Sequence, residues 1–277
     1  MKERTAARLA WTIAALALLG VAATATMAIL NRSVIHTVDQ ADPIEIVLPI
    51  GYAIMGALVA IRRPRNPVGW IFLGIAFLGA WPGFTQQYVI RDLRVHHLPF
   101  TAWVAWTHDL PLTLVFPTGL ATFFFLLFPE GRFASRRWRR LGWLAAAFVA
   151  VGLAANVTQS TIQLADLPDI RNPIGLDINI WNGPIGAVLW LGGIGILAAA
   201  MVGTALRMRR SSGEERQQLK WLAYAAVATV IALVGLIIAS LAHNNIPNGW
   251  FDLIIVLGFG LAIPVSCGVA MLKHGLY

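Results

Sequence analysis

His108 and Asp109 stand next to each other in a long apolar stretch of the sequence. A charged side chain at the centre of a membrane helix costs about 2.5–3.5 kcal/mol on insertion scales, so ionisable residues in such stretches are candidates for function. An imidazole changes its charge near neutral pH, and a neighbouring carboxylate can hold a negative charge. The pair predicts either an outward-facing pocket that senses a ligand or a proton, or a pair that only bonds to neighbouring helices or meets lipid headgroups.

Other polar side chains are expected at the same outer level of the membrane, each near the end of an apolar segment. Side chains at such positions commonly meet water and uncapped backbone groups, so each one alone is typical of a helix end. Together they would line an outer vestibule. The candidate ligand-sensing residues are His108, Asp109, Glu45, Gln86, Gln159 and Asp252, with Gln87 and Asn156 at the same level.

The sequence contains none of the common catalytic motifs: no His-Glu-x-x-His, no Gly-x-Ser-x-Gly, no Walker loop and no dinucleotide-binding glycine pattern. His96 and His97 are adjacent and lack the i, i+4 spacing that places two imidazoles on one helix face. Cys267 is the only cysteine, which excludes an intrachain disulfide. We therefore expect no enzyme activity, no cofactor and no metal site in this chain.

About eight apolar segments of membrane length must position these residues. Of the 277 residues, 58% are hydrophobic and 12% are charged, which is outside the balance of a soluble domain. A hydrocarbon core about 30 Å thick needs roughly 20 apolar residues per helix. The expected fold class is all-α, a single polytopic transmembrane helical bundle over residues 1–277. The predicted spans are residues 9–30, 45–61, 69–88, 101–128, 142–159, 183–206, 219–242 and 250–272.

The basic residues alternate between turns, and this alternation predicts the orientation of the bundle. Of the 21 Lys and Arg residues, all but Arg32, Arg91, Arg94 and Arg171 fall on one side. Cytoplasmic loops of membrane proteins carry an excess of Lys and Arg, so both termini are predicted to be cytoplasmic. The net charge of +8 is then explained by topology and anionic lipid, and no nucleic-acid partner is expected.

The first span leaves an alternative topology open. Basic residues precede an apolar stretch that contains Ala23-Thr24-Ala25, which resembles a signal-peptidase site. Cleavage there would leave seven spans. The apolar stretch continues to Leu30 and is as long as a membrane span, so we expect the first span to be retained.

Three of the basic turns carry short motifs. Residues 62–70 read RRPRNPVGW, a turn that prolines make too irregular to fold alone and that must hold a helical hairpin. Residues 128–132 read FPEGR and precede a basic stretch. Residues 212–215 read SGEE, the spacing of a capping box, so a helix is expected to begin there, before the bilayer. The residues expected to contact lipid or a cytoplasmic partner are Arg62, Arg63, Arg65, Arg136, Arg137, Arg139, Arg140, Glu215 and Arg216.

These three turns, in this order, and the ending of residues 263–277 resemble the N-terminal membrane module of a group of bacterial sensor histidine kinases. In that family the turns read R-x-N-P-[VI]-G-W, F-P-[DE]-G-R and G-E-E-R-Q-Q-L-K-W, and this chain differs from the first pattern at its first position, where it has Pro64. The resemblance implies a signal-input bundle in the bacterial inner membrane, whose last helix continues into the kinase segments of a homodimer. This chain stops at Tyr277 without a phosphoacceptor-histidine helix or an ATP-binding segment, so a kinase segment would act in cis or in trans.

Transport is the main alternative to sensing. Transporters use interrupted helices to expose backbone groups to substrate, and Pro111, Pro117 and Pro264 lie inside predicted spans. The inner two-thirds of the spans are mostly apolar, however, and provide no continuous polar path. A stand-alone membrane scaffold is a further alternative. Gly79 and Gly83 have a spacing that permits close helix approach within the bundle or between protomers, and the expected homodimer rests on the family resemblance.

Overall fold

The computed structural model describes residues 3–34, 43–115, 118–164, 167–176, 180–181, 183–213, 216, 220, 222–223, 227 and 256–273. Within these residues the chain is mostly helical, and its strands form a single short hairpin. Five helices are long and apolar enough to cross a membrane: Glu3–Asn31, Glu45–Arg62, Pro67–Arg94, Arg136–Thr158 and Pro184–Arg210. The predicted all-α class is confirmed for this part of the chain, and the helix lengths indicate a membrane protein.

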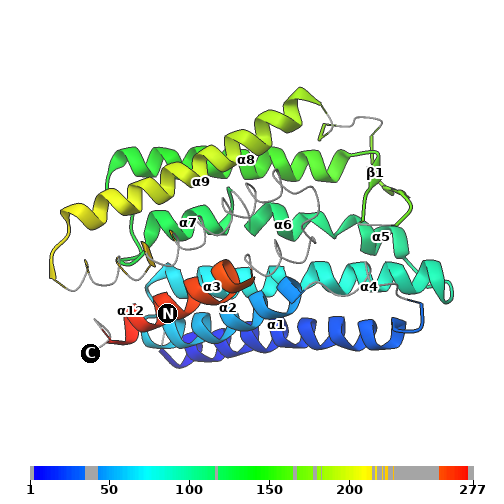
Figure 1. Cartoon of the computed structure of the whole chain (residues 1–277), viewed down its shortest axis with the longest axis horizontal. Helices are drawn as coiled ribbons and strands as arrows, with labels where there is room; N and C mark the ends of the chain where they lie inside the picture. The colour runs from blue at the N-terminus through cyan, green and yellow to red at the C-terminus, as the bar shows by residue number, and fades with distance from the viewer. Residues whose placement is uncertain are drawn as a thin grey trace, which may run out of the picture.

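Four helices form the first half of the bundle (Figure 1). They are α1 (Glu3–Asn31), α2 (Pro43–Arg62), α3 (Pro67–Gly79) and α4 (Trp81–Arg94). Helix α1 packs against the other three, and α2 packs most extensively against α3. The third predicted span, residues 69–88, thus corresponds to α3 and α4, which follow each other with a boundary at Ala80.

Two glycines allow α2 and α3 to approach closely. A Cβ at Gly69 would lie 2.5 Å from the backbone nitrogen of Ala60, and a Cβ at Gly56 would lie 2.8 Å from that of Leu73. Asn66 caps the start of α3, because its Oδ1 accepts a hydrogen bond from the backbone N–H of Val68 at 3.0 Å. The hairpin predicted at residues 62–70 is confirmed.

The predicted fourth span, residues 101–128, is divided into three short helices instead of forming one bent helix. They are α5 (Thr101–Trp106), α6 (Asp109–Val115) and α7 (Leu120–Leu127). Pro111 has no N–H to donate to the carbonyl of Thr107, and it lies in the first turn of α6, where the missing donor is tolerated. As a result, His108 lies in the break between α5 and α6. Residues 116–117, which include Pro117, lie outside the described part of the chain.

The second half of the bundle contains α7, α8 (Arg136–Thr158) and α9 (Pro184–Arg210), with α6 between it and the first half (Figure 1). Helix α9 packs against α7 and α8, and α6 packs against both α8 and α3. Between α8 and α9, strands β1 (Thr161–Ile162) and β2 (Ile170–Arg171) pair antiparallel. This hairpin was not expected from the sequence, because each strand is only two residues long.

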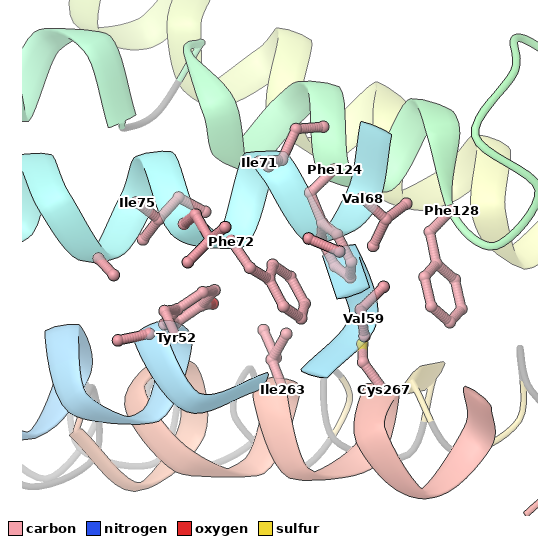
Figure 2. Packing of buried hydrophobic residues seen from close by; sticks show 14 of the residues in the cluster. Tyr52, Val59, Val68, Ile71, Phe72, Ile75, Phe124, Phe128, Ile263 and Cys267 are labelled. Carbon is pink, nitrogen blue, oxygen red and sulfur yellow. The ribbon is translucent and has the colours of Figure 1, made fainter. Parts of the chain in front are cut away.

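The C-terminal part of the described chain packs against α2. It consists of a π-helix, η1 (Val256–Ala262), and α12 (Ile263–Lys273). Ile263 and Cys267 of α12 are buried beside Tyr52 of α2 and Phe72 of α3 in the main apolar cluster (Figure 2). The predicted span 219–242 lies almost entirely outside the described residues, as do residues 250–255 of the last span, which include Asp252.

The two ends of the bundle differ. The start of α1 and the end of α12 lie at one end, whereas α5 and β1 lie at the other (Figure 1). The turn between α2 and α3 and the turn between α7 and α8 belong to the first of these ends (Figure 1). We call the first the basic end and the second the hairpin end.

Candidate functional site

A cavity of about 330 Å³ lies between α6, α8 and α9, toward the hairpin end. Part of the lining is apolar or aromatic, and these lining residues are Leu112, Phe148, Gly152, Trp181, Leu189 and Trp190. The polar lining residues are Asp109, Thr113, Thr118, Asn156, Gln159, Thr161 and Gln163. Asp109 is the only ionisable side chain among these residues, so the described part of the lining carries no positive charge.

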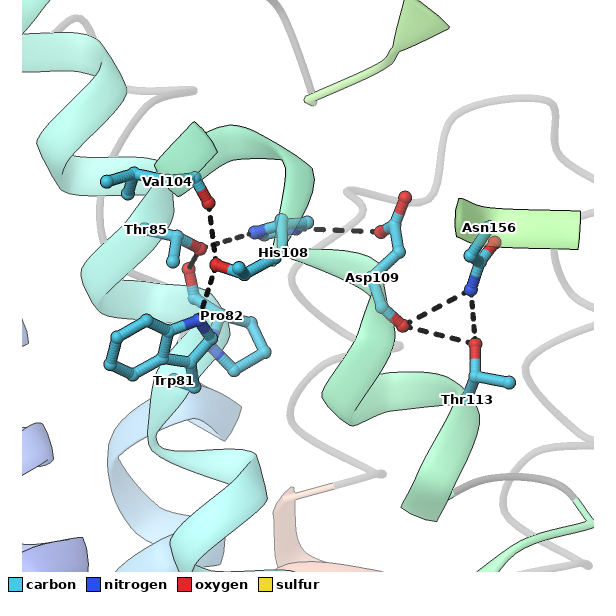
Figure 3. Close-up of polar contacts among 9 residues, drawn as sticks. Trp81, Pro82, Thr85, Val104, His108, Asp109, Thr113 and Asn156 are labelled. Carbon is cyan, nitrogen blue, oxygen red and sulfur yellow. Dashed lines mark hydrogen bonds and ion pairs between the residues drawn. The ribbon is translucent and has the colours of Figure 1, made fainter. Parts of the chain in front are cut away.

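Hydrogen bonds between α6 and α8 hold the backbone of Asp109 at the cavity wall (Figure 3). The amide of Asn156 donates to the Asp109 carbonyl at 3.4 Å and also to the Thr113 hydroxyl. That hydroxyl in turn is bonded to the Asp109 carbonyl at 3.1 Å. Asn156 is 5% exposed, so its amide replaces water as the partner of these groups. The network uses the backbone of Asp109 and leaves its carboxylate for other contacts.

His108 lies behind Asp109, against α4, and does not line the cavity. Its Nδ1 is 2.8 Å from the Thr85 hydroxyl, which donates its own proton to the Pro82 carbonyl at 2.8 Å (Figure 3). The hydroxyl therefore accepts from Nδ1–H, and the unprotonated Nε2 of a neutral imidazole faces Asp109 Oδ1 at 4.0 Å. His108 can take up a proton on Nε2 and so face the Asp109 carboxylate as a cation. While the imidazole is neutral, the carboxylate is available to an external cation.

Among the described residues, the members of the predicted vestibule do not lie in one ring. The cavity combines Asp109 with Gln159, and His108 joins them only through Asp109. Glu45 lies elsewhere, between α1, α2 and α4: a Cβ at Gly83 would be 2.7 Å from its Oε2 and 2.8 Å from Thr24 Cγ2. Gln86 is half-buried on α4 and does not line the cavity, and Asp252 lies outside the described residues.

The aromatic residues of the cavity were not predicted from the sequence. Trp181 precedes α9 and Trp190 lies in its second turn, so both read as ordinary interfacial aromatics near the start of a span. The Nε1 atom of Trp181 is buried without a hydrogen-bond partner among the described residues. The indole therefore presents ring carbons to the cavity. Only the packing of α9 on α8 brings these residues to the same cavity as Asp109.

The motif-bearing turns at the basic end are bonded to one another. The Asn66 amide donates to the Pro129 carbonyl at 2.8 Å, which joins the turns of residues 62–70 and 128–132. Arg207 near the end of α9 donates to the Phe128 carbonyl at 2.8 Å and also to the Phe125 carbonyl. The two turns and the end of α9 thus form one assembly, although about 140 residues separate its first and last members.

A groove of about 1030 Å³ lies beside this assembly, between the start of α8 and the end of α9. Its polar edge includes Arg132, Arg137 and Arg210, and its apolar wall includes Trp138 and Leu206. Arg132 Nε donates to Glu130 Oε2 at 2.6 Å, and this bond raises the pKa of the guanidinium.

The arginines predicted to contact lipid or a partner are exposed wherever they are described. These are Arg62, Arg63, Arg65, Arg136, Arg137, Arg139, Arg140 and Arg216, and Glu215 lies outside the described residues. Among proteins already characterised, no family model, no curated sequence and no solved structure matches this chain.

Proposed function

We propose that the chain is the signal-input module of a histidine-kinase-like two-component system in a bacterial inner membrane. In this proposal the bundle has eight spans, both termini are cytoplasmic and the basic end faces the cytoplasm. The observation that carries the proposal is the cavity, in which Asp109 is the only carboxylate among the described lining residues, toward the end of the bundle away from the bonded motif turns. Such a cavity is where an external ligand, lipid or proton would be sensed.

Two packed routes lead from the cavity toward the basic end. Helix α9 lines the cavity with Trp190 and, 17 residues later, bonds the Phe128 carbonyl through Arg207, a distance of about 26 Å along the helix. Helix α6 packs against α3, α3 against α2, and α2 against η1 and α12. A ligand that binds one packing arrangement more tightly than another would shift the equilibrium between them. The last helix would transmit that shift to the cytoplasmic side.

The partners follow from the same proposal. A kinase segment, in cis or in trans, would receive the signal from α12, and the protein would work as a homodimer, as the resemblance of the three turns implies. Lipid is the partner of the exposed arginines, because juxtamembrane basic residues are attracted to anionic headgroups by about 1 kcal/mol each.

The single cysteine offers a direct test. Cys267 is fully buried on α12, so its labelling rate with a membrane-permeant maleimide reports how α12 packs in nanodiscs. Asp109→Asn removes the charge in the cavity and is expected to change the rate by about fivefold or more, the lower end of typical coupling between sites. Asp169→Asn is the matched control, since Asp169 is exposed and outside the cavity. Equal rates in all three proteins would refute coupling between cavity and last helix.

Transport remains a second proposal, because the division of residues 101–128 into three helices and the π-helix η1 resemble the interrupted helices of carriers. Liposomes that contain the purified protein would then take up an organic solute along or against a gradient. Absence of flux for a broad panel of cationic, neutral and anionic solutes would remove this alternative.

A further inference from the structure

We infer that the cavity between α6, α8 and α9 binds a small organic monocation, a quaternary ammonium or a protonated amine. The inference names the ligand class of the proposed sensing site and rests on that proposal only for its biological role. It depends on three properties of the cavity: its charge, its aromatic side and its size.

The charge of the lining selects a cation. Asp109 is the only ionisable side chain among the described lining residues, and it is one-third exposed. His108 Nε2 is 4.0 Å from Asp109 Oδ1, beyond hydrogen-bond distance, and the other ring nitrogen of His108 is bonded to Thr85. An anion would be repelled, whereas a monocation would supply the counter-charge that the described lining residues lack.

The aromatic side of the cavity selects an organic cation over a metal ion. Trp181, Trp190 and Phe148 line it together, and the face of an indole is the best π-partner for an ammonium group. The Cη2 atom of Trp181 lies 3.9 Å from where a Cβ on Gly152 would stand, so its ring carbons reach the α8 wall. Calcium sites usually combine several carboxylates among six or more oxygen ligands, and Asp109 is the only carboxylate among the described lining residues.

The size of the cavity limits the ligand. Its volume of about 330 Å³ is at the lower end of the range for small-molecule sites. Leu112 and Leu189 add apolar surface suited to methyl groups, and Thr161 and Gln163 can bond a hydroxyl or carbonyl substituent. A choline-sized cation fits this combination of charge, rings and volume.

Choline and its uncharged isostere 3,3-dimethyl-1-butanol separate charge from shape. Binding to the whole chain in nanodiscs would be measured by calorimetry. Choline is expected to bind at least about tenfold more tightly than the alcohol, which corresponds to about 1.4 kcal/mol. Equal affinity for the two, or no binding of choline or tetramethylammonium, would overturn the inference.

Variants locate the interaction. Asp109→Asn and Trp190→Leu should each weaken choline binding by about tenfold or more, while Trp190→Phe should retain part of the affinity because it keeps an aromatic face. Asp169→Asn and Trp143→Leu, at an exposed carboxylate and an exposed indole outside the cavity, should leave it unchanged. Trp190 is 52% exposed, so its replacement leaves the core intact if Asp109→Asn proves unstable. Choline affinity that neither cavity variant changes would place the cation elsewhere and refute the site.

The labelling of Cys267 keeps this inference distinct from the proposed function. Choline binding that depends on Asp109 but leaves Cys267 labelling unchanged would support the ligand class and contradict the sensor role. A change of labelling in Asp109→Asn without any cation binding would support the sensor role and contradict the ligand class.

Discussion

At the residue scale, Gly131 is a position where both the backbone conformation and the close packing of a neighbouring turn require glycine. Its φ is +77°, in the left-handed region, and a Cβ there would lie 2.5 Å from Pro67 Cδ and 2.7 Å from Asn66 Oδ1. Glycine therefore permits the contact between the two motif turns, since any other residue would add both backbone strain and a clash. The same contact brings the Asn66 amide to the Pro129 carbonyl.

Gly131→Ala should accordingly lower the free energy of unfolding by about 1–3 kcal/mol for strain alone, with a further loss from the clash. Gly213→Ala is the matched control, because Gly213 has φ +62° but no atom of the described residues lies within 4 Å of the Cβ position. Thermal unfolding in one detergent would compare the two variants. Equal shifts in both would show that the turn–turn contact contributes nothing.

At the scale of elements, α6 and α8 form one wall of the cavity, and side-chain hydrogen bonds as well as packing hold these two helices together. Asn156 on α8 reaches both the Thr113 hydroxyl and the Asp109 carbonyl on α6. Gly152 allows this approach, because a Cβ there would lie 3.0 Å from Thr113 Cγ2. The position of Asp109 in the cavity thus depends on the contact between two helices.

A double-mutant cycle of Asn156→Leu and Thr113→Val should reveal a coupling of about 0.5–1.5 kcal/mol in unfolding free energy, because each variant removes one side of the same bond. Thr158→Val serves as the control partner, since the Thr158 hydroxyl bonds within α8, to the Ala154 carbonyl at 2.7 Å. Asn156→Leu and Thr158→Val should be additive. An additive result for Asn156 and Thr113 as well would mean that packing alone forms the wall.

At the scale of the whole molecule, the proposed topology places the bonded motif turns and the β1–β2 hairpin on opposite sides of the membrane. In a Cys267→Ala background, Arg139→Cys and Asp169→Cys provide labelling sites at the start of α8 and in the segment between β1 and β2. A membrane-impermeant maleimide should label Asp169→Cys in intact spheroplasts and Arg139→Cys only in inverted vesicles. Labelling of both from one side would refute the topology.

Much of the helical framework could be predicted from composition, and part of the site could not. The predicted spans 9–30, 45–61, 142–159 and 183–206 correspond to α1, α2, α8 and α9, because an uninterrupted apolar run of that length satisfies its backbone as a helix. Residues 101–128 are predicted as one span that contains Pro111 and Pro117. The sequence does not say whether these prolines divide the helix, since neighbouring elements have to accept the freed backbone groups.

The sequence by itself determined the helical class, the basic turns and Asp109 as an unusual carboxylate, because length, charge and apolar context are local properties. Only the tertiary structure decided that Asp109 shares a cavity with Trp181 and Trp190 rather than with Glu45. It also decided that Asn66, Pro129 and Arg207 belong to one bonded assembly. These pairings join residues far apart in the chain, and which helix faces meet depends on side-chain shape and small-residue contacts across the whole bundle.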